Sequence, residues 1–488
     1  MTDTTIELGP QLNLIDGEWV EPSIELDAWI EDPNTGAAVQ AQRSTDSAGI
    51  DAALAAAWRV HSSGDWQALG AAGRAERLFA LGAALEVEAA AVARLEAAES
   101  GAPIGITSML SFIVHAAFGL AGAQINGGIL SARFEGPTGR DVEVERFGWG
   151  PAVLLCPWNA PAPMAAHKAA SALAAGCPII IKPPERVPHG TAAIAAAAQA
   201  VGIPAGVIQL VHGGPDVGAA LIGDPRCRVV SFTGGTVGGR AIAHQCAEGL
   251  KPVQLELGGH SPLVVLPDAD VDVAADAAVA LLTTLNGQWC RALGRLIVPT
   301  DLHDALLDAI GARLSQLQLG HSLDPTTQMG PIVSSAHLAL LHATIAELTS
   351  RGGTAHTWTA LPGGDLAGGN WLAPTLVTGV DPSLTGHEIF GPVATVHTYD
   401  TVDEAIALAN GTEYGLEAYV IGTDEDEAMV AARRIVAGGV KVNGASPMSL
   451  HLMAPRPAWG ISGLHDEGTV ETIHFFGGNR TVGVEGSL

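Results

Sequence analysis

The sequence predicts an α/β fold with more than one domain, and three observations predict it. The chain has 488 residues, which exceeds what one hydrophobic core usually organises. Its apolar fraction of 48% and charged fraction of 15% are typical of a globular protein with deep cores. From residue 151 onward, short apolar runs rich in β-branched residues alternate with Ala-rich stretches. That alternation predicts parallel sheets with helices on both faces.

The N-terminal part predicts a strand, a turn and helices. "LNLIDGEWVEP" at 12–22 predicts a short strand, "DPNTG" at 32–36 a turn, and the Ala-rich stretches that begin at 49 and 75 predict helices. The uncharged stretch 102–132 is long enough to span a bilayer, but it holds Pro, His, Gln and Asn and has no basic flank. We therefore expect a buried or interface helix there.

Two α/β series follow. Strands of the first are expected at "PAVLLCP", "CPIIIKP", "VIQLVHG" and "RVVSFTG", and those of the second at "SPLVVLPDADV", "GRLIVPT", "ATVHTYD" and "EAYVIGT". Ligands of parallel sheets bind at the carboxyl ends of the strands, where "PWN", "KPPE", "GGPDVG" and "FTGGTVGG" fall. Residues 134–150 alternate apolar and polar positions and predict an exposed hairpin. The β-rich segment 472–484 could pair with such a hairpin, including one on another subunit.

Charge and cysteine content exclude several classes of partner. A net charge of −27 argues against nucleic acid and anionic membrane surfaces, which require clustered Lys and Arg, and solubility explains the charge. The five cysteines form no Cys-x-x-Cys pair and no Cys/His metal spacing, so we expect free thiols and no metal site. The N-terminus "MTDTTIELGP" has acidic residues and no apolar segment typical of a secretory signal. A cytoplasmic location is therefore expected.

Short motifs run through the chain in an order that carries a resemblance. They are "DPNTG", "PWN", "IKPPE", "FTGGTVGG", "LELGGHSP", "NGQWCRALGR", "MGPIV", "HEIFGPV" and "TEYGLEA". Each alone is weak, but the series at compatible spacing resembles the NAD(P)-dependent aldehyde dehydrogenase superfamily nearly from end to end.

The resemblance implies a division of the chain. It implies a Rossmann-like NAD-binding domain of parallel-sheet type from residues 1–125 and 149–257, and an α/β catalytic domain from 258–455. The hairpin and strand at 126–148 and 470–488 would form a small oligomerisation element. A homodimer or homotetramer is then expected, with a small aldehyde as the substrate.

Cys290 is the candidate nucleophile. A bare aldehyde is a poor hydride donor, so a thiolate must first add to the carbonyl, and loss of hydride to nicotinamide then leaves a thioester. Gly287 would allow close backbone approach before Cys290, and the residues after Cys290 are read as a helix start whose N–H groups favour the thiolate. The other four cysteines are expected to be inert packing residues.

Three further residues complete the expected chemistry. The resemblance supplies Asn159 as a side-chain donor to the oxyanion, beside the backbone N–H of Cys290. Glu256 lies between two leucines and before two glycines, an apolar setting that raises a carboxyl pKa and suits a general base for thioester hydrolysis. Lys168 matches a lysine near the reactive centre that relays protons or stabilises charge.

The cofactor is expected to be NAD. "FTGGTVGG" breaks a strand at Gly234 and begins a helix whose N–H groups could face a pyrophosphate. By resemblance, Lys182 and Glu185 hold the adenosine ribose, and the carboxylate of Glu185 would repel a 2′-phosphate, which makes NADP less favoured. The full set of expected cofactor contacts is Trp158, Lys182, Glu185, Phe232, Gly234, Gly235, Thr236, Gly239, Leu257, Glu388 and Phe390.

Some features depart from the family pattern or leave the function open. His260 replaces the commoner lysine, His387 replaces one of two acids, and "PRPAWGISG" at 455–463 lacks a lysine and a Gly pair. An apolar tunnel is suggested by Trp149, Trp158, Trp289 and Met164, but the sequence does not identify the aldehyde. The alternatives are a CoA-acylating semialdehyde dehydrogenase, against which Glu256 argues, and a catalytically silent binding protein on the same fold.

Overall fold

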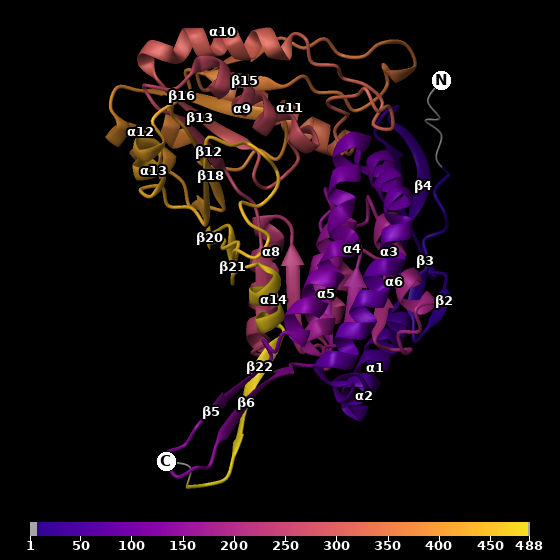
Figure 1. Cartoon of the computed structure of the whole chain (residues 1–488). Coiled ribbons are helices and arrows are strands. Elements are labelled where there is room, and N and C mark those ends of the chain that lie inside the picture. The colour runs from indigo at the N-terminus through magenta and orange to yellow at the C-terminus, as the bar shows by residue number, and fades with distance from the viewer. Residues whose placement is uncertain (1–6, 487–488) are drawn as a thin grey trace.

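The protein consists of two parallel-sheet bodies and a projecting three-stranded arm (Figure 1). The computed structural model describes residues 7–486. Residues 1–6, on which part of the expectation about a secretory signal rests, and residues 487–488 of the predicted oligomerisation element lie outside the described residues. The positions of the domain boundaries stay a prediction.

The first sheet has eight strands, and its centre is parallel as the alternating pattern predicts. In spatial order its strands are β2 (Glu18–Val20), β1 (Asn13–Ile15), β9 (Ile208–Leu210), β8 (Ile179–Lys182), β7 (Ala152–Leu155), β10 (Val229–Thr233), β11 (Val253–Glu256) and β21 (Gly463–Leu464). At one edge, β2 and β1 pair antiparallel and β1 runs antiparallel to β9, and at the other edge β21 runs antiparallel to β11. The predicted strand at 12–22 is thus the hairpin β1–β2.

Helices cover both faces of this sheet because both sets of alternating side chains are apolar. Leu154, Ile179 and Ile181 pack under one group of helices, and Val153 and Ile180 under the other. The first group is α3 (Gly70–Ser100), α4 (Ile104–Asn126), α5 (Pro161–Ala175), α6 (His189–Ala200) and α14 (Thr469–Phe475). The second group is α1 (Ser47–Ser63), α7 (Pro215–Gly223) and α8 (Thr236–Glu248), while the short α2 (Asp65–Ala68) leads into α3.

Helix α4 is the predicted uncharged helix. Within residues 7–486 it is the one helix with the length and hydropathy of a membrane span. It packs between α3 and α5 (Figure 1), and Val114 and Phe118 are completely buried. Its Phe112 is half exposed and faces a cavity described below. The apolar side chains of α4 are thus divided between the core, where Val114 and Phe118 lie, and a partly exposed face that includes Phe112.

The second sheet has seven strands and the same parallel centre. In spatial order they are β14 (Thr354–Thr357), β15 (Thr375–Thr378), β16 (Val393–Tyr399), β13 (Leu293–Pro299), β12 (Ser261–Val265), β18 (Glu417–Ile421) and β19 (Gly439–Val442). Its helices are α9 (Val271–Thr283), α10 (His303–Leu314), α11 (Ser335–Ser350), α12 (Val402–Ala409) and α13 (Glu425–Ala432). α9 and α10 pack on one face, and α12 and α13 on the other.

Two smaller pairings join the outlying segments. Strands β3 (Ile24–Asp32) and β4 (Ala37–Ser44) form a hairpin whose turn is the predicted "DPNTG". Strands β17 (Tyr414–Gly415) and β20 (Trp459–Gly460) pair antiparallel, and Gly463 pairs with Glu256, so the unusual 455–463 segment runs from β17 to the edge of the first sheet.

The arm consists of β5 (Ser131–Phe134), β6 (Val142–Gly148) and β22 (Gly477–Gly483). β22 pairs with β6 of the same chain and extends away from the body (Figure 1). The expected pairing of the C-terminal segment with the hairpin is therefore confirmed within one chain. The prediction of strand for the whole of 472–484 is wrong in its first part, because Ile473 and Phe476 are buried against α5 and the segment Thr469–Phe475 is helical.

Candidate active site

A cavity of about 540 Å³ lies at the carboxyl ends of the strands of the first sheet. Strands β7, β8, β10 and β11 end at it, which is where open parallel sheets bind ligands. We call it the cofactor cavity. Its wall contains these predicted cofactor contacts: Trp158, Lys182, Glu185, Phe232, Gly234, Gly235, Leu257, Glu388 and Phe390.

A second cavity, of about 200 Å³, lies between α4, α5 and the loop after β19. We call it the substrate cavity. Its wall is mostly apolar and includes Leu110, Phe112, Ile113, Leu120, Met164, Leu285, Trp289, Met448 and Leu452. Four residues line both cavities: Asn159, Thr233, Glu256 and Cys290. The predicted nucleophile, base and oxyanion donor therefore stand where the two cavities meet.

A tightly wound loop presents Cys290. Leu285, Asn286 and Gly287 all have positive φ angles, of 51°, 58° and 70°. Asn286 fixes the loop, since its side-chain nitrogen donates to the carbonyls of Gly101 and Pro331 at 2.9 and 2.8 Å. At Gly287 a Cβ atom would lie 2.4 Å from the backbone of residues 391–392, so only glycine fits. The expected close approach is confirmed.

The expected helix after Cys290 is wrong. Residues 291–292 form a turn, and strand β13 begins at Leu293. Gly294 packs against His260, where a Cβ would lie 2.4 Å from the ring, and β13 is held between β12 and β16. Sheet pairing overrides the local helical composition here, so no helix begins directly after the cysteine.

Glu256 ends strand β11 and faces the cysteine. The Sγ of Cys290 lies 3.4 Å from Oε1 of Glu256, within reach for the thiol to donate to the carboxylate. Burial raises the pKa of Glu256 to about 7, and the Glu467 carboxylate adds to the rise. Burial also raises the pKa of the Cys290 thiol, and the charge of Glu256 raises it further. The pair can pass a proton from sulfur to carboxylate.

Asn159 lies just before the first turn of α5, which begins at Pro161. Its side-chain nitrogen donates to the carbonyl of Gln288, two residues before the cysteine, at 3.0 Å. An amide nitrogen carries two hydrogens, so a second donor is available in the shared wall of the cavities. That arrangement fits an oxyanion donor.

Lys168 lies behind this centre and lines neither cavity. It is completely buried, donates to the Ser231 hydroxyl at 2.8 Å and lies 3.3 Å from a carboxylate oxygen of Glu467. Burial alone would raise the pKa of Glu467, but the charges of Lys168 and Arg456 lower it to about 2. Lys168 therefore reaches the substrate cavity through Glu467, which lines it.

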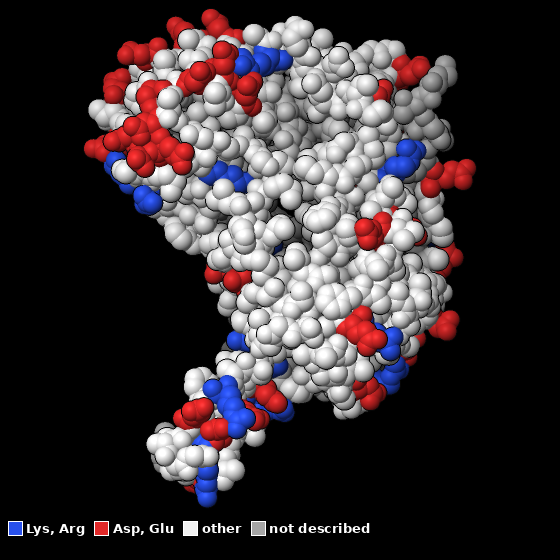
Figure 2. Space-filling model, viewed as in Figure 1, with Lys and Arg blue, Asp and Glu red and all other residues white. Residues whose placement is uncertain are grey.

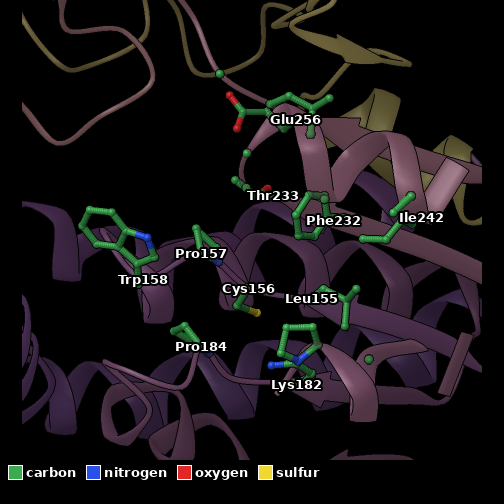
Figure 3. Close-up of a pocket in the computed structure, with 18 of the residues that line it drawn as sticks. Leu155, Cys156, Pro157, Trp158, Lys182, Pro184, Phe232, Thr233, Ile242 and Glu256 are labelled. Carbon is green, nitrogen blue, oxygen red and sulfur yellow. The ribbon is translucent and has the colours of Figure 1, made fainter. Parts of the chain in front are cut away.

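The far end of the cofactor cavity carries an ion pair. Lys182, the last residue of β8, donates to Glu185 at 2.7 Å and to the Pro183 carbonyl at 3.0 Å. Figure 3 shows Trp158 and Phe232 on opposite sides of the cavity, Lys182 at one end and Glu256 at the other. The cavity thus runs from a cation and a carboxylate to the cysteine.

Aromatic and acidic groups enclose the cysteine end of the cofactor cavity. Glu388 accepts from the Gly259 N–H at 2.9 Å, and burial raises its pKa to about 7. The rings of Trp158 and Phe390 meet edge to face at 5.2 Å. The Nε2 of His337 lies 2.6 Å from the Phe390 carbonyl oxygen. Because a carbonyl oxygen only accepts hydrogen bonds, Nε2 is the protonated nitrogen of this ring.

Two predicted cofactor contacts lie just outside the cavity wall. Thr236 is the first residue of α8, so the predicted helix start at the glycine-rich turn is confirmed, and its buried hydroxyl has no partner. Gly239 packs against the Leu257 side chain, where a Cβ would lie 2.5 Å away. Gly239 thus lets α8 approach the strand that ends at Glu256.

Several wall residues were not predicted. Thr233 lines both cavities with an unpartnered buried hydroxyl, and its position at the end of β10 was the available signal. His337 on α11 reaches the cavity from far along the chain, without a sequence signal. Of the four aromatic or apolar residues expected in a tunnel, Trp289 and Met164 line the substrate cavity and Trp158 the cofactor cavity. Trp149 does not, since it lies beside the arm and donates to the Phe475 carbonyl.

The structure combines a cavity at the carboxyl ends of a parallel sheet, a second and mostly apolar cavity, and the thiol of Cys290 between them. Comparison with known proteins gives the family. Residues 19–482 match the sequence model of the Aldehyde dehydrogenase family, and the chain belongs to that family. The expected resemblance and fold class are confirmed, and the family supports aldehyde oxidation as the general activity.

Individual relatives match most of the chain. It is 35% identical to the geranial dehydrogenase of Castellaniella defragrans over 89% of this chain and 91% of that one. It is 34% identical to the non-phosphorylating aspartate-semialdehyde dehydrogenase of Halomonas elongata, over 96% and 94%. A solved betaine aldehyde dehydrogenase from Staphylococcus aureus in complex with NAD⁺ superposes with a TM-score of 0.92 at 28% identity, over 96% and 94% of the two chains.

Proposed function

We propose that the protein oxidises an uncharged, apolar aldehyde to the carboxylic acid with NAD⁺. The observation that carries this proposal is the 3.4 Å contact between Cys290 and Glu256 at the junction of the two cavities. This contact supports a nucleophile and a base that would act within reach of both a substrate and a cofactor.

The residues of the cofactor cavity fit a dinucleotide. The buried hydroxyls of Thr233 and Thr236 lack partners, and Gly235 opens on free space at the start of α8. Those groups and the helix N–H groups would hold a pyrophosphate. Lys182 and Glu185 would hold the adenosine ribose, and the Glu185 carboxylate would repel a 2′-phosphate, which favours NAD over NADP. When bound, the nicotinamide supplies the acceptor of hydride.

Each of three side chains has a separate role in the proposed reaction. Glu256 takes the proton of the thiol, the Cys290 sulfur bonds to the aldehyde carbon, and the carbonyl electron pair moves onto oxygen. Asn159 donates to that oxyanion. Departure of hydride from the carbon restores the C=O bond and leaves a thioester. Glu256 releases the thiol proton to solvent and then deprotonates a water, whose oxygen bonds to the thioester carbon. The C–S bond then breaks, and the acid leaves with the thiolate regenerated.

The substrate cavity supports an uncharged substrate. The relatives are named for geranial, aspartate semialdehyde and betaine aldehyde, which differ in charge, so their names do not indicate the charge of this protein's substrate. Each arginine in the wall lies near a carboxylate: Arg291 is 3.4 Å from Glu417, and Arg456 is 3.7 Å from Glu467. In Figure 2, a hollow near the middle of the face shown is bordered mostly by uncharged residues. An ionic substrate would lose hydration without gaining an unpaired counter-charge.

A panel of aldehydes of matched length tests the proposal. We expect NADH formation with kcat/KM highest for aliphatic and aromatic aldehydes, and lower for an ω-carboxylate semialdehyde and a quaternary ammonium aldehyde. Ile113→Asp places a charge in the wall and should lower kcat/KM for the apolar aldehyde, whereas Met109→Asp on the exposed face of α4 is the control. Preference for either ionic aldehyde would reject the substrate class.

The CoA-acylating alternative gives a different product. Glu256 argues against it, because a hydrolytic base beside the thioester would discard the acyl group. We expect the carboxylic acid to form at full rate without CoA. A requirement for CoA would support the alternative, and no NADH with any aldehyde would support a silent binding protein.

We also propose a homodimer or homotetramer. The arm β5–β6–β22 projects from the body (Figure 1), and its edge strand β5 is exposed along its length. Exposed edges of this kind favour pairing with another chain. Light scattering of the purified protein tests the state, with a monomer contradicting it. The cytoplasmic location stays a prediction, which fractionation of cells would test.

A further inference from the structure

No helix begins directly after Cys290, so the positive charge that would favour its thiolate has to come from elsewhere. Strand β13 follows the cysteine, and the carboxylates of Glu256 and Glu388 stand on the cofactor side. Burial and both carboxylates oppose loss of the thiol proton. A buried thiol with two acidic neighbours is a poor nucleophile unless a cation offsets them.

Arg291 is the cation nearest in the chain. It follows Cys290 directly and lines the substrate cavity together with Cys290 and Glu256. Its side chain is only 15% exposed, and its Nε lies 3.4 Å from a carboxylate oxygen of Glu417 on β18. The Tyr419 hydroxyl donates to the Arg291 carbonyl at 2.9 Å and so fixes its backbone.

A second buried cation shares the same carboxylate. Lys441 on β19 lies 3.7 Å from the other oxygen of Glu417, and the side chains of Lys441 and Glu417 are 4% and 6% exposed. Lys441 also donates to the carbonyls of Ser446 and Met448, in the loop that borders the substrate cavity. The cluster of Arg291, Glu417 and Lys441 holds two cations and one anion.

The excess positive charge of this cluster is costly unless an anion balances it. The charges of Arg291, Lys441 and Glu417 sum to +1, and Cys290 and Glu256 share one negative charge, on the sulfur or on the carboxylate, that can balance it. Glu417 contacts both cations, so its single negative charge cannot cancel both, and the remaining positive charge favours the negative charge that Cys290 and Glu256 share.

We propose that Arg291, held by Glu417, is the electrostatic partner that stabilises the thiolate of Cys290. The proton leaves the sulfur for Glu256, as the 3.4 Å contact allows, and no electron is transferred. This inference rests on Cys290 as the nucleophile of the proposed function. In this proposal, the Arg291 side chain stabilises the thiolate, a role that the sequence predicted for a helix N-terminus after Cys290.

Alkylation of the free enzyme by iodoacetamide tests the proposal without any aldehyde or cofactor. The alkylation rate follows the thiolate fraction, so its pH profile reports the pKa of the reacting cysteine. The other four cysteines are at most 8% exposed, and Cys290→Ser measures their background. Arg291→Met removes the charge at similar length, Arg291→Lys keeps it, and Glu417→Gln removes the opposing charge but keeps an acceptor oxygen.

The expected shifts have opposite signs. Arg291→Met should move the midpoint of the pH profile upward by about one pH unit, which makes alkylation about tenfold slower at a fixed pH below the midpoint. Arg291→Lys should restore most of the wild-type rate. Glu417→Gln should move the midpoint downward. A general disturbance of the fold would shift both variants the same way, and that result, or an unchanged midpoint in Arg291→Met with a native melting curve, would overturn the proposal.

The failure of the proposed function is distinguishable from failure of this inference. If Cys290→Ser still oxidised aldehydes, the nucleophile assignment would fall, whatever the alkylation profile of Arg291→Met. If Cys290→Ser is inactive and the Arg291→Met profile equals that of the wild type, only the role of Arg291 is rejected.

Discussion

Glu256 and Glu467 both line the substrate cavity, yet their carboxyl groups have opposite pKa shifts. Burial and its acidic neighbour raise the pKa of Glu256 to about 7. Burial would raise that of Glu467 as well, but the adjacent Lys168 and Arg456 lower it to about 2. Two like groups thus have different protonation states near neutral pH, which suits one of them to accept protons and the other to stay charged.

The first prediction concerns the pH dependence of deacylation. Glu256 accepts a proton only when ionised, so the hydrolysis rate should rise with pH through about 7 and level off above it. Glu256→Gln should remove this rise and slow deacylation about a hundredfold or more. Single-turnover experiments should then show one NADH per site before turnover stalls, formed more slowly than in the wild type because the thiol also loses its base. An unchanged steady-state rate in the variant would exclude Glu256 as the base.

The second prediction concerns the nucleophile. Cys290→Ala should reduce aldehyde oxidation to no more than a few per cent, because no covalent adduct can form. NAD⁺ binding, measured by calorimetry, should persist, since the opposite end of the cavity is untouched. Cys156→Ala is the matched control: Cys156 also lines the cofactor cavity, but burial raises its pKa to about 12, and its loss should leave oxidation intact.

The third prediction concerns the oxyanion donor. Asn159→Asp keeps the shape of the side chain but removes both amide hydrogens and adds a negative charge, and Asn159→Ala removes the group. Both should lower kcat by roughly a hundredfold to a thousandfold with little change in NAD⁺ affinity. A change confined to KM would instead show that Asn159 serves only in binding.

The strands and the residues at their carboxyl ends could be predicted from the sequence. Short apolar runs that end in Gly or Pro are local signals, and parallel pairing brings their ends together without further information. That is why Asn159, Lys182, Phe232 and Glu256 were found to line a common cavity. Thr233 shares this position and was overlooked only because its residue type carries no distinctive chemistry.

The remaining features depend on contacts between distant segments. The residues after Cys290 have a helical composition, but pairing with β12 and β16 makes them a strand. Glu417 is buried beside Arg291 although 126 positions separate them. His337, on α11, contacts the carbonyl of Phe390, which lies in a loop far along the chain. The segment from Thr469 is β-rich in composition, but burial against α5 makes it a helix. No local pattern encodes such contacts.

The last prediction concerns stability away from the site. Glu96, on α3, is 2% exposed and accepts from the Ala162 N–H at the start of α5 at 2.6 Å. Burial raises its pKa to about 8, the N–H of Ala162 opposes the rise, and Glu99 one turn along adds to it. Because the folded state holds this proton more tightly than the unfolded state, the stability it contributes is complete below about pH 4.5 and is lost as pH rises through about 8.

Glu96→Gln keeps the acceptor oxygen but cannot ionise, so it should escape that loss. We expect the melting temperature of the variant to exceed that of the wild type by an amount that grows between about pH 4.5 and pH 8 and then levels off. Glu88→Gln removes the same charge from the exposed face of α3 and controls for net charge. Melting curves that differ by a constant amount across this range would mean that Glu96 keeps its ordinary pKa in the folded protein, and the buried carboxyl would then be ionised at neutral pH.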